Sequence, residues 1–321
     1  MLIKTLKTNK PFAFIVFFVS ALLLYIIDLI VTPPLYISFE HPIFSSWAQF
    51  FVSYPWLSYT AVFVIGLLLA MGWNNLLTDR GVFKNVTILP AYIFVILSSG
   101  FNLSSLWICS FIMLFVLNKL MSTYQHQKPF AHLYDSGFLI GLSFLIYPPS
   151  LVFFLVVLFS NAIYTALEWR NFVIPILGLF TPLLFGATLG YFFDKLELLF
   201  NFYLSSFDFQ NFSIEWTTEL ITWVSLVGLL FLLSFKEMLL WLSMKNLRSR
   251  KSFYLLFVYS WCVFLSLFMA PNTFNHLLFL VLPLSVIIAN YFMFLQKKWW
   301  YEGAIIVLIL CTIYLHIAPH I

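Results

Sequence analysis

Charged residues are scarce in this chain: Asp, Glu, Lys and Arg together make up 9% of its 321 residues. A soluble domain carries roughly a quarter charged residues, so this composition excludes an ordinary soluble protein. Hydrophobic residues make up 63% of the chain and aromatic residues 21%, and the mean hydropathy is +1.00. We therefore expect one integral membrane domain over residues 1–321. The formal net charge of +4 does not indicate nucleic-acid binding, because no soluble domain carries it.

Cysteine is scarce as well, with three residues that all lie inside apolar runs and form no CxxC pair. This placement is typical of small buried side chains rather than of disulfides or metal ligands. The sequence has no HExxH, GxSxG or P-loop motif, and its six histidines are scattered along the chain. These absences argue against zinc peptidases, serine hydrolases of the α/β type and P-loop nucleotide-binding proteins. We expect neither a metal nor a cofactor.

Long apolar runs dominate the rest of the sequence. A helix needs about 20 apolar residues to cross the hydrocarbon core of a membrane. The first run ends without a small-residue cleavage site, so we interpret it as a spanning helix that is retained. In all, the runs predict eleven spans, near residues 12–31, 57–74, 86–101, 103–121, 134–149, 150–167, 172–193, 219–235, 253–270, 276–296 and 301–318.

The distribution of Lys and Arg agrees with this map, because the cytoplasmic loops of membrane proteins carry an excess of both. With the N-terminus in the cytoplasm, 15 of the 16 Lys and Arg residues fall on the inner side, and Lys195 alone lies outside. We therefore expect an all-α, polytopic transmembrane helix bundle of about 11 spans, with a cytoplasmic N-terminus and a periplasmic C-terminus. The basic segment "KNLRSRK" (245–251) sets this topology in the first interpretation, and specific binding of anionic lipid is the alternative.

Residues 43–54, "IFSSWAQFFVSY", predict a short helix that lies on the membrane surface. Their aromatic and aliphatic side chains recur at helical spacing, while serines and a glutamine take the opposite face. Twelve residues are too few to span a membrane, so we expect an interfacial helix on the outer side. It follows directly on a polar stretch, "DLIVTPPLYISFEHP" (28–42).

This polar stretch holds the candidate catalytic residues, which are Asp28, Glu40 and His41. A carboxylate in an apolar cleft has a raised pKa, which suits it to act as a general base. The alternative is that Asp28 is an interfacial carboxylate near the lipid headgroups and that Glu40 and His41 are solvated loop residues. The composition fits a shallow, outward-facing site, and nothing in the sequence requires one.

Four further polar residues are candidates for binding or structural contacts. Asp135 lies at the start of the fifth predicted span, where it caps the helix or makes a polar contact inside the bundle. Arg170 is expected to pair locally with Glu168 or to anchor a partner subunit. Lys195 and His276 are candidates for contacts with a lipid phosphate, although a histidine at headgroup level is the plainer interpretation of His276.

The block 133–183 contains "DSGFLIGLSFLIY", then an aromatic-rich span, then "EWRNFVIPILG". With "PLSVIIANYF" (283–292), these motifs resemble an uncharacterised family of multi-spanning inner-membrane proteins of Gram-negative bacteria. The resemblance runs through most of the chain and implies a location in the bacterial inner membrane, but no activity. Members of that family are often labelled beta-carotene monooxygenase. We reject the label, because the oxygenases of that name are soluble propellers that hold iron with four histidines.

A fainter similarity in layout is to the polytopic glycosyltransferases that use polyprenyl-phosphate sugars. In those enzymes an acidic residue in the first outer loop precedes an interfacial helix, as Asp28 and Glu40 precede residues 43–54 here. The resemblance implies that Lys195 or His276 lies near the phosphate. This chain departs from the pattern, since recognition of a lipid phosphate calls for outer arginines or lysines and Lys195 is the only one.

Two functional hypotheses of different class follow. The first is a non-catalytic subunit or scaffold of a cell-envelope complex, with membrane lipids and other envelope membrane proteins as partners. The second is a glycosyltransferase-like enzyme that acts on a lipid-linked sugar at the periplasmic face. The enzyme requires its candidate residues to converge on one cleft of several hundred cubic ångströms, whereas the scaffold predicts that they scatter.

Overall fold

The computed structural model describes residues 6–7, 11–31, 45–83, 86–126, 128–164, 168–206, 217–242, 245–270, 273–294 and 298–317. Every element in these ranges is an α-helix or a short 3-10 helix. A backbone that crosses lipid must satisfy its own hydrogen bonds, and the α-helix does so within one segment. The expected all-α fold is therefore confirmed.

The helices follow one another with short connections. In the first half of the chain they are α2 (Pro11–Val31), α3 (Ser45–Ser53), α4 (Pro55–Asp79), α5 (Leu89–Ser98), α6 (Ser105–Ser122) and α7 (Phe130–Ile146). In the second half they are η2 (Pro148–Phe153), α8 (Phe154–Tyr164), α9 (Trp169–Phe192), α10 (Leu196–Ser205), α11 (Thr218–Leu242), α12 (Leu247–Ser266), η3 (Leu267–Met269), α13 (Thr273–His276), α14 (Leu278–Phe294) and α15 (Lys298–Ile317).

Five helical segments of the described chain are long and apolar enough to cross a membrane. They are Pro55–Asp79, Ser105–Ser122, Trp169–Phe192, Thr218–Leu240 and Leu247–Met269. Shorter apolar stretches of 10–17 residues are Pro11–Ile27, Leu89–Ser98, Phe130–Ile146, Pro148–Tyr164, Leu278–Phe294 and Trp299–Leu315. Together these segments coincide with the predicted spans. A helical membrane protein with several spanning helices is thus supported, while the count of about 11 stays a prediction.

Helix α5 differs most from its predicted span of residues 86–101. It has ten residues, a length of about 15 Å at 1.5 Å per residue, against a hydrocarbon core of about 30 Å. All of its residues except Val95 are buried. An apolar run predicts burial in lipid or in protein equally well, and here protein covers it on nearly every side.

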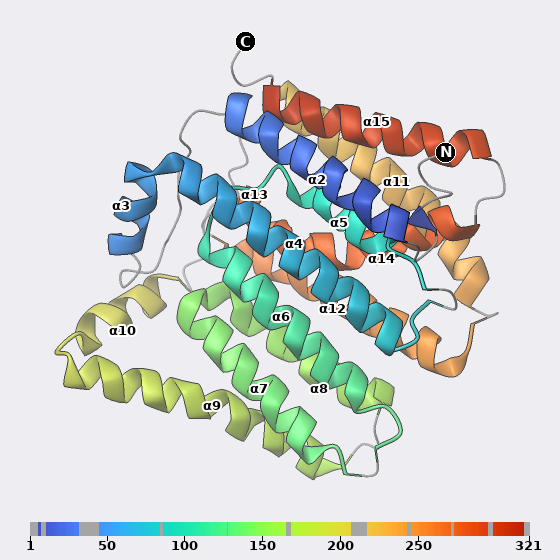
Figure 1. Cartoon of the computed structure of the whole chain (residues 1–321). Helices are drawn as coiled ribbons and strands as arrows, with labels where there is room; N and C mark the ends of the chain where they lie inside the picture. Colours follow the sequence, from blue (N-terminus) through green and yellow to red (C-terminus); the bar gives the residue numbers. More distant parts are fainter. Residues whose placement is uncertain are drawn as a thin grey trace.

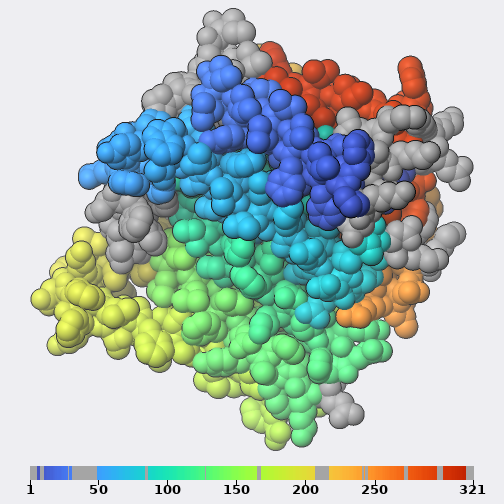
Figure 2. Space-filling view, in the orientation of Figure 1, coloured from blue at the N-terminus to red at the C-terminus, as the bar shows by residue number. Residues whose placement is uncertain are grey.

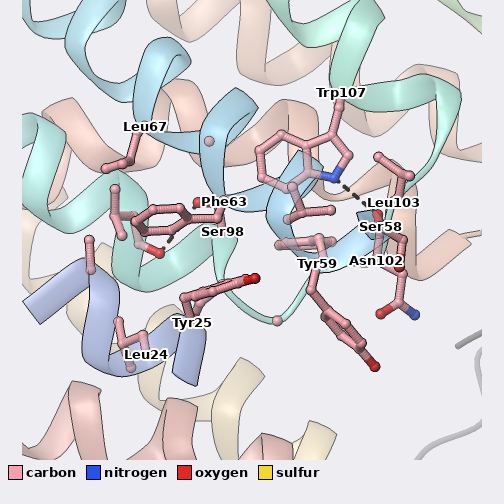
Figure 3. Close-up of a pocket in the computed structure, with 17 residues that line it drawn as sticks. Leu24, Tyr25, Ser58, Tyr59, Phe63, Leu67, Ser98, Asn102, Leu103 and Trp107 are labelled. Carbon is pink, nitrogen blue, oxygen red and sulfur yellow. Dashed lines mark hydrogen bonds between the residues drawn. The ribbon is translucent and has the colours of Figure 1, made fainter. Parts of the chain in front are cut away.

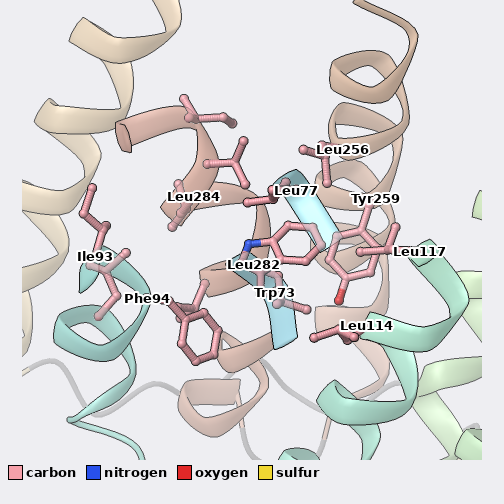
Figure 4. Packing of buried hydrophobic residues seen from close by; sticks show 14 of the residues in the cluster. Trp73, Leu77, Ile93, Phe94, Leu114, Leu117, Leu256, Tyr259, Leu282 and Leu284 are labelled. Atoms are coloured by element: carbon pink, nitrogen blue, oxygen red, sulfur yellow. The ribbon is translucent and has the colours of Figure 1, made fainter. Parts of the chain in front are cut away.

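The core of the molecule is built around α5 and α14. Figure 1 shows these two helices behind α4, with α2, α11 and α15 on one side and α6, α7, α8 and α9 on the other. Figure 4 shows the centre, where Trp73 of α4 lies among leucines of α6, α12 and α14 and beside Tyr259. The Trp73 indole N–H donates to the Ser285 hydroxyl at 3.1 Å, so the largest core side chain also has its polar atom satisfied.

Glycine brings α7 and α9 into the closest helix packing of the molecule. A Cβ atom added at Gly137 would strike the carbonyl of Pro175, and one at Gly178 would strike the carbonyl of Tyr134. A Cβ at Gly141 would lie 2.6 Å from the carbonyl oxygen of Leu179. Small residues that let two backbones approach are typical of helix pairs in membranes.

Two peripheral pieces extend from this body. Helix α3 lies within the predicted interfacial segment 43–54 and packs against α4, from which Tyr54 alone separates it (Figure 1). The predicted helix is confirmed there, and its place on the membrane surface stays a prediction. On the same side, the end of α9 and all of α10 project from the body as a corner (Figure 2).

Candidate functional site

The predicted catalytic cluster falls at the edge of what the structure describes. Asp28 belongs to the last turn of α2, but its side chain is not among those described. Glu40 and His41 lie outside the described residues. The nearest described features are therefore the side chains one turn earlier on α2, beginning with Tyr25.

Tyr25 lines a cavity of about 70 Å³ between α2, the start of α4, and the turn that joins α5 to α6. Its ring packs against Phe63 at a centroid distance of 4.8 Å. Figure 3 shows this pair on one side of the cavity, with Asn102 and Trp107 on the other. The cavity lies at the end of α2 that the charge distribution assigns to the outer face, which is where the candidate cluster was expected.

The polar groups of this cavity are largely used by the protein itself. Ser58 donates to the carbonyl of Pro55 at 2.6 Å, and the Trp107 indole donates to the carbonyl of Asn102 at 3.0 Å. None of the described residues that line the cavity carries a charge. It can therefore hold a few water molecules or a small neutral group, and the ionisable side chains among those residues are the phenols of Tyr25 and Tyr59.

Lys195 lies elsewhere, at the corner between α9 and α10. It lines an apolar groove of about 900 Å³, formed by the end of α7, the second half of α9, and α10. Gly190 lets α10 pack closely against α9 at this corner, since a Cβ there would lie 2.9 Å from Leu199. Tyr203 forms part of the wall and donates its hydroxyl to the carbonyl of Leu145 at 3.1 Å. The groove thus offers a long apolar surface with one amine.

His276 is fully buried within the protein, and its depth at headgroup level stays a prediction. Its Nε2 lies 2.7 Å from the Ser266 hydroxyl, and its Nδ1 lies 2.9 Å from the Tyr147 hydroxyl. The Ser266 hydroxyl can also donate to the carbonyl of Val263. Each ring nitrogen therefore has a hydroxyl within hydrogen-bond distance, and a hydroxyl can donate or accept. This arrangement satisfies a neutral imidazole at both nitrogens.

The described candidates for a lipid-phosphate site do not meet. Lys195 lines the groove at the corner of α9 and α10, whereas His276 lines neither that groove nor the cavity at Tyr25. In the sequence, His276 is a candidate for a lipid-phosphate contact because it follows a loop. The sequence holds no sign that this loop folds into the protein and brings the ring against Tyr147, which lies 129 residues earlier.

Asp135 does not cap its helix, because α7 begins five residues earlier, at Phe130. Its carboxylate instead accepts a hydrogen bond from Lys119 of α6 at 2.7 Å, and both side chains are partly exposed. The contact that the sequence left as the second interpretation is the one present. It ties the C-terminal end of α6 to the N-terminal part of α7.

Arg170 is an exposed residue in the first turn of α9. Its guanidinium lies 5.7 Å from the centre of the Trp169 ring, within cation–π range. Glu168 and Arg170 are both described, and they form no ion pair. The local pair predicted for this turn is therefore wrong: the guanidinium lies over the neighbouring aromatic ring instead.

A polar cluster that the sequence did not reveal surrounds Lys245, between α11 and α12. Its amine donates to the side-chain oxygen of Asn290 at 2.8 Å and lies 4.2 Å from the centre of the Phe253 ring. The rings of Phe83 and Phe294 also lie within 6 Å of it. Burial lowers the pKa of Lys245 to about 8. In the sequence, Lys245 belongs to a basic segment whose lysines and arginines are predicted to set the topology. Nothing in the segment distinguishes it from the others.

Comparison with known proteins adds a family and no activity. The sequence profile of a family of unknown function (DUF6427) matches residues 1–321, the whole chain. Comparisons with curated proteins and with solved structures gave no match. The expected resemblance to an uncharacterised family is therefore confirmed.

Proposed function

The chain belongs to the DUF6427 family of unknown function, and from its own residues we propose that it is a non-catalytic, polytopic subunit or scaffold of a cell-envelope membrane complex. The chain lies in the bacterial inner membrane and crosses it about eleven times, with its N-terminus in the cytoplasm. Lipids and other envelope membrane proteins surround it. The placement of Lys and Arg supports this orientation.

The observation that carries the proposal is the use of polar side chains for internal contacts. His276 is held at both nitrogens by Tyr147 and Ser266, and Asp135 is paired with Lys119. A catalytic acid or base must be free to exchange a proton with a substrate. These groups instead hold helices against one another, which is what a scaffold needs from them.

The first turn of α9 supplies the surface on which we place a partner. Trp169 is 70% exposed there and lies beside Arg170, which is exposed as well. Tryptophan and arginine are the residues most enriched at the centres of protein interfaces. An adjacent exposed pair at the end of a spanning helix therefore suits contact with another membrane protein.

The experiment is purification of the tagged, full-length chain in a mild detergent, with quantitative mass spectrometry of the proteins that co-elute. The proposal expects an envelope protein in stoichiometric amount that survives washing. It also expects Arg170→Glu to lower its recovery, while the matched charge reversal Arg250→Glu does not. A chain that elutes alone, or a partner retained equally by both variants, would overturn the proposal as placed on α9.

The groove beside Lys195 favours a second candidate, the glycosyltransferase-like enzyme for a lipid-linked sugar. An apolar groove of about 900 Å³ can take part of a polyprenyl chain, and the Lys195 amine can meet its phosphate. Asp28 is the base in this scheme. A polyprenyl-phosphate species that co-purifies with the wild type and is lost from Lys195→Gln would favour it. Loss of sugar transfer in Asp28→Asn would then identify the base.

A further inference from the structure

A second groove runs between α11 and α12, the two helices that flank the basic segment. Its volume is about 490 Å³, and it is lined from α11 by Phe235, Leu239 and Leu242. From α12 it is lined by Arg250, Tyr254, Phe257 and Trp261. Leu239, Tyr254 and Trp261 are 55%, 45% and 70% exposed, so the groove is open to whatever surrounds the protein.

The groove exists because consecutive helices pack on different neighbours. Helix α11 packs on α14 and α15, whereas α12 packs on α8, η2 and α14. Phe235 and Phe257 meet edge to face at 5.5 Å and close the gap at one level. Elsewhere α11 and α12 leave a channel whose walls are aliphatic and aromatic. An acyl chain fits such largely apolar walls, because its contact with them removes apolar surface from water.

The dimensions of the groove match one leaflet. On α12 its lining residues recur every three or four positions, from Arg250 to Trp261, and so form a single stripe. Eleven residues of helix measure about 16 Å, close to half of a hydrocarbon core of about 30 Å. Arg250, at the polar end of the stripe, lies in the first turn of α12. Trp261, at the apolar end, lies further along the same helix.

The charge at the polar end calls for an anion. The first turn of α12 contains no acidic residue, and its N-terminus carries the positive end of the helix dipole. Of the basic residues nearby, Lys245 is enclosed by rings and Lys251 lies over Tyr124, 5.5 Å from its centre. Arg250 is the one that lines the groove. Its guanidinium can hold two phosphate oxygens at once.

We propose that this groove binds one anionic phospholipid, with an acyl chain along Leu239, Tyr254 and Trp261 and the headgroup phosphate on Arg250. The site lies on the face that carries the basic residues. It is separate from the groove beside Lys195 and from the exposed pair Trp169 and Arg170. It therefore does not depend on the proposed scaffold role, and either proposal can fail without the other.

The test is native mass spectrometry of the full-length protein in detergent, titrated in parallel with phosphatidylglycerol and with phosphatidylethanolamine. We expect one phosphatidylglycerol to bind more tightly than the zwitterionic lipid. Arg250→Gln should weaken that binding about tenfold, the usual effect of losing a charge-assisted contact. The matched control Arg248→Gln removes an exposed arginine of the same helical turn that does not line the groove, and it should bind as the wild type does.

A second variant separates the groove from surface charge alone. Leu239→Trp fills the channel and leaves Arg250 in place, so it should reduce retention of phosphatidylglycerol while its melting temperature stays that of the wild type. Equal binding of both lipids, or unchanged binding in Arg250→Gln, would overturn the proposal. So would unchanged binding in Leu239→Trp, which would mean that the basic face attracts anionic lipid without a groove. A co-purified peptide displaced by neither lipid would assign the groove to a protein partner instead.

Discussion

At the scale of single residues, His276 has no free nitrogen with which to act. Its two ring nitrogens lie against the hydroxyls of Tyr147 and Ser266 inside a buried site. A hydroxyl at each nitrogen can satisfy a neutral imidazole in either tautomer. Its contribution is to join the end of α7 to the segment between α12 and α14.

Removal of the Tyr147 hydroxyl should expose this role. Tyr147→Phe keeps the ring but leaves Nδ1 of His276 buried without its hydroxyl partner, so we expect a loss of about 1–3 kcal/mol in the free energy of unfolding. A thermal melt of the purified protein in detergent would show it as a lower melting temperature. Tyr134→Phe breaks an exposed hydrogen bond to Thr181 and serves as the control with a smaller effect. Equal melting of the two variants would contradict the structural role of His276.

Lys245 predicts a dependence of stability on pH. Burial holds its pKa at about 8 in the folded protein, below the 10.5 of a free lysine. Between these values the unfolded chain holds a proton that the folded chain has released. Stability should therefore rise as pH rises from about 8 to about 10.5, by up to about 3 kcal/mol, and should be level below 8, where both states hold the proton.

Melting temperatures of Lys245→Met across that pH range would test this dependence. The variant has no amine to titrate among the surrounding aromatic rings. Its melting temperature should therefore rise less with pH than that of the wild type. Lys251→Met removes a neighbouring amine outside the cluster and should keep the rise. If Lys245→Met and the wild type rise equally, Lys245 is not the group responsible.

The sequence predicted the chemistry of individual residues only where their neighbours are close in the chain. The C-terminal end of α6 and the N-terminal part of α7 are joined by a short connection, and a contact of Asp135 inside the bundle was among the open alternatives. The contacts of Lys245 with Asn290, and of His276 with Tyr147, link segments far apart in the chain. Hydropathy and spacing carry no information about such long-range pairs. Asp28, Glu40 and His41 remain predictions.

At the scale of helices, the α7 and α9 pair depends on glycine. Gly137→Ala places a methyl group against the carbonyl of Pro175, a backbone atom that cannot move aside alone. We expect the helices to separate, with a loss of about 1–3 kcal/mol. The measurement is again a thermal melt in detergent, made at one pH.

Gly228→Ala on α11 is the matched control, because nothing lies within 4 Å of a Cβ added there. Alanine forms helices better than glycine does, so this control should melt at or slightly above the wild-type temperature. A Gly137→Ala protein as stable as the control would show that α7 and α9 are not in close contact.

Existence and type of the helices followed from the apolar runs, while their lengths and surroundings did not. Helix α3 lies inside the predicted segment 43–54, and α9 matches the predicted span 172–193 to within three residues at its start and one at its end. Helix α5, by contrast, fills ten of the sixteen positions from 86 to 101. Leucine and phenylalanine partition into lipid and into a protein core alike, so composition alone does not tell a spanning helix from a buried one.

At the scale of the whole molecule, the proposed topology places Lys195 and Arg250 on opposite sides of the membrane. One candidate span, Thr218–Leu240, lies between them. Labelling of Lys195→Cys and Arg250→Cys in intact cells with a membrane-impermeant maleimide should therefore modify the first variant only. After permeabilisation both should react.

The native cysteines give a low background in that experiment, since Cys109 and Cys262 are buried and Cys311 is half-buried. Labelling of the unsubstituted chain measures this background directly. Labelling of both variants from the same side would show that α11 does not cross the membrane. The number of spans would then no longer be odd, and the opposite placement of the two termini would lose its basis.

The short length of α5 has a consequence for how the protein is made. A ribosome delivers Leu89–Ser98 to the membrane long before it has synthesised α14, against which these residues finally pack. Ten residues cannot hold a transmembrane position by themselves, so this segment waits at the membrane until Leu278–Phe294 arrives. A chain that is truncated before Leu278 leaves the segment uncovered. Burial of α5 near the start of the chain thus depends on a helix that is made close to its end.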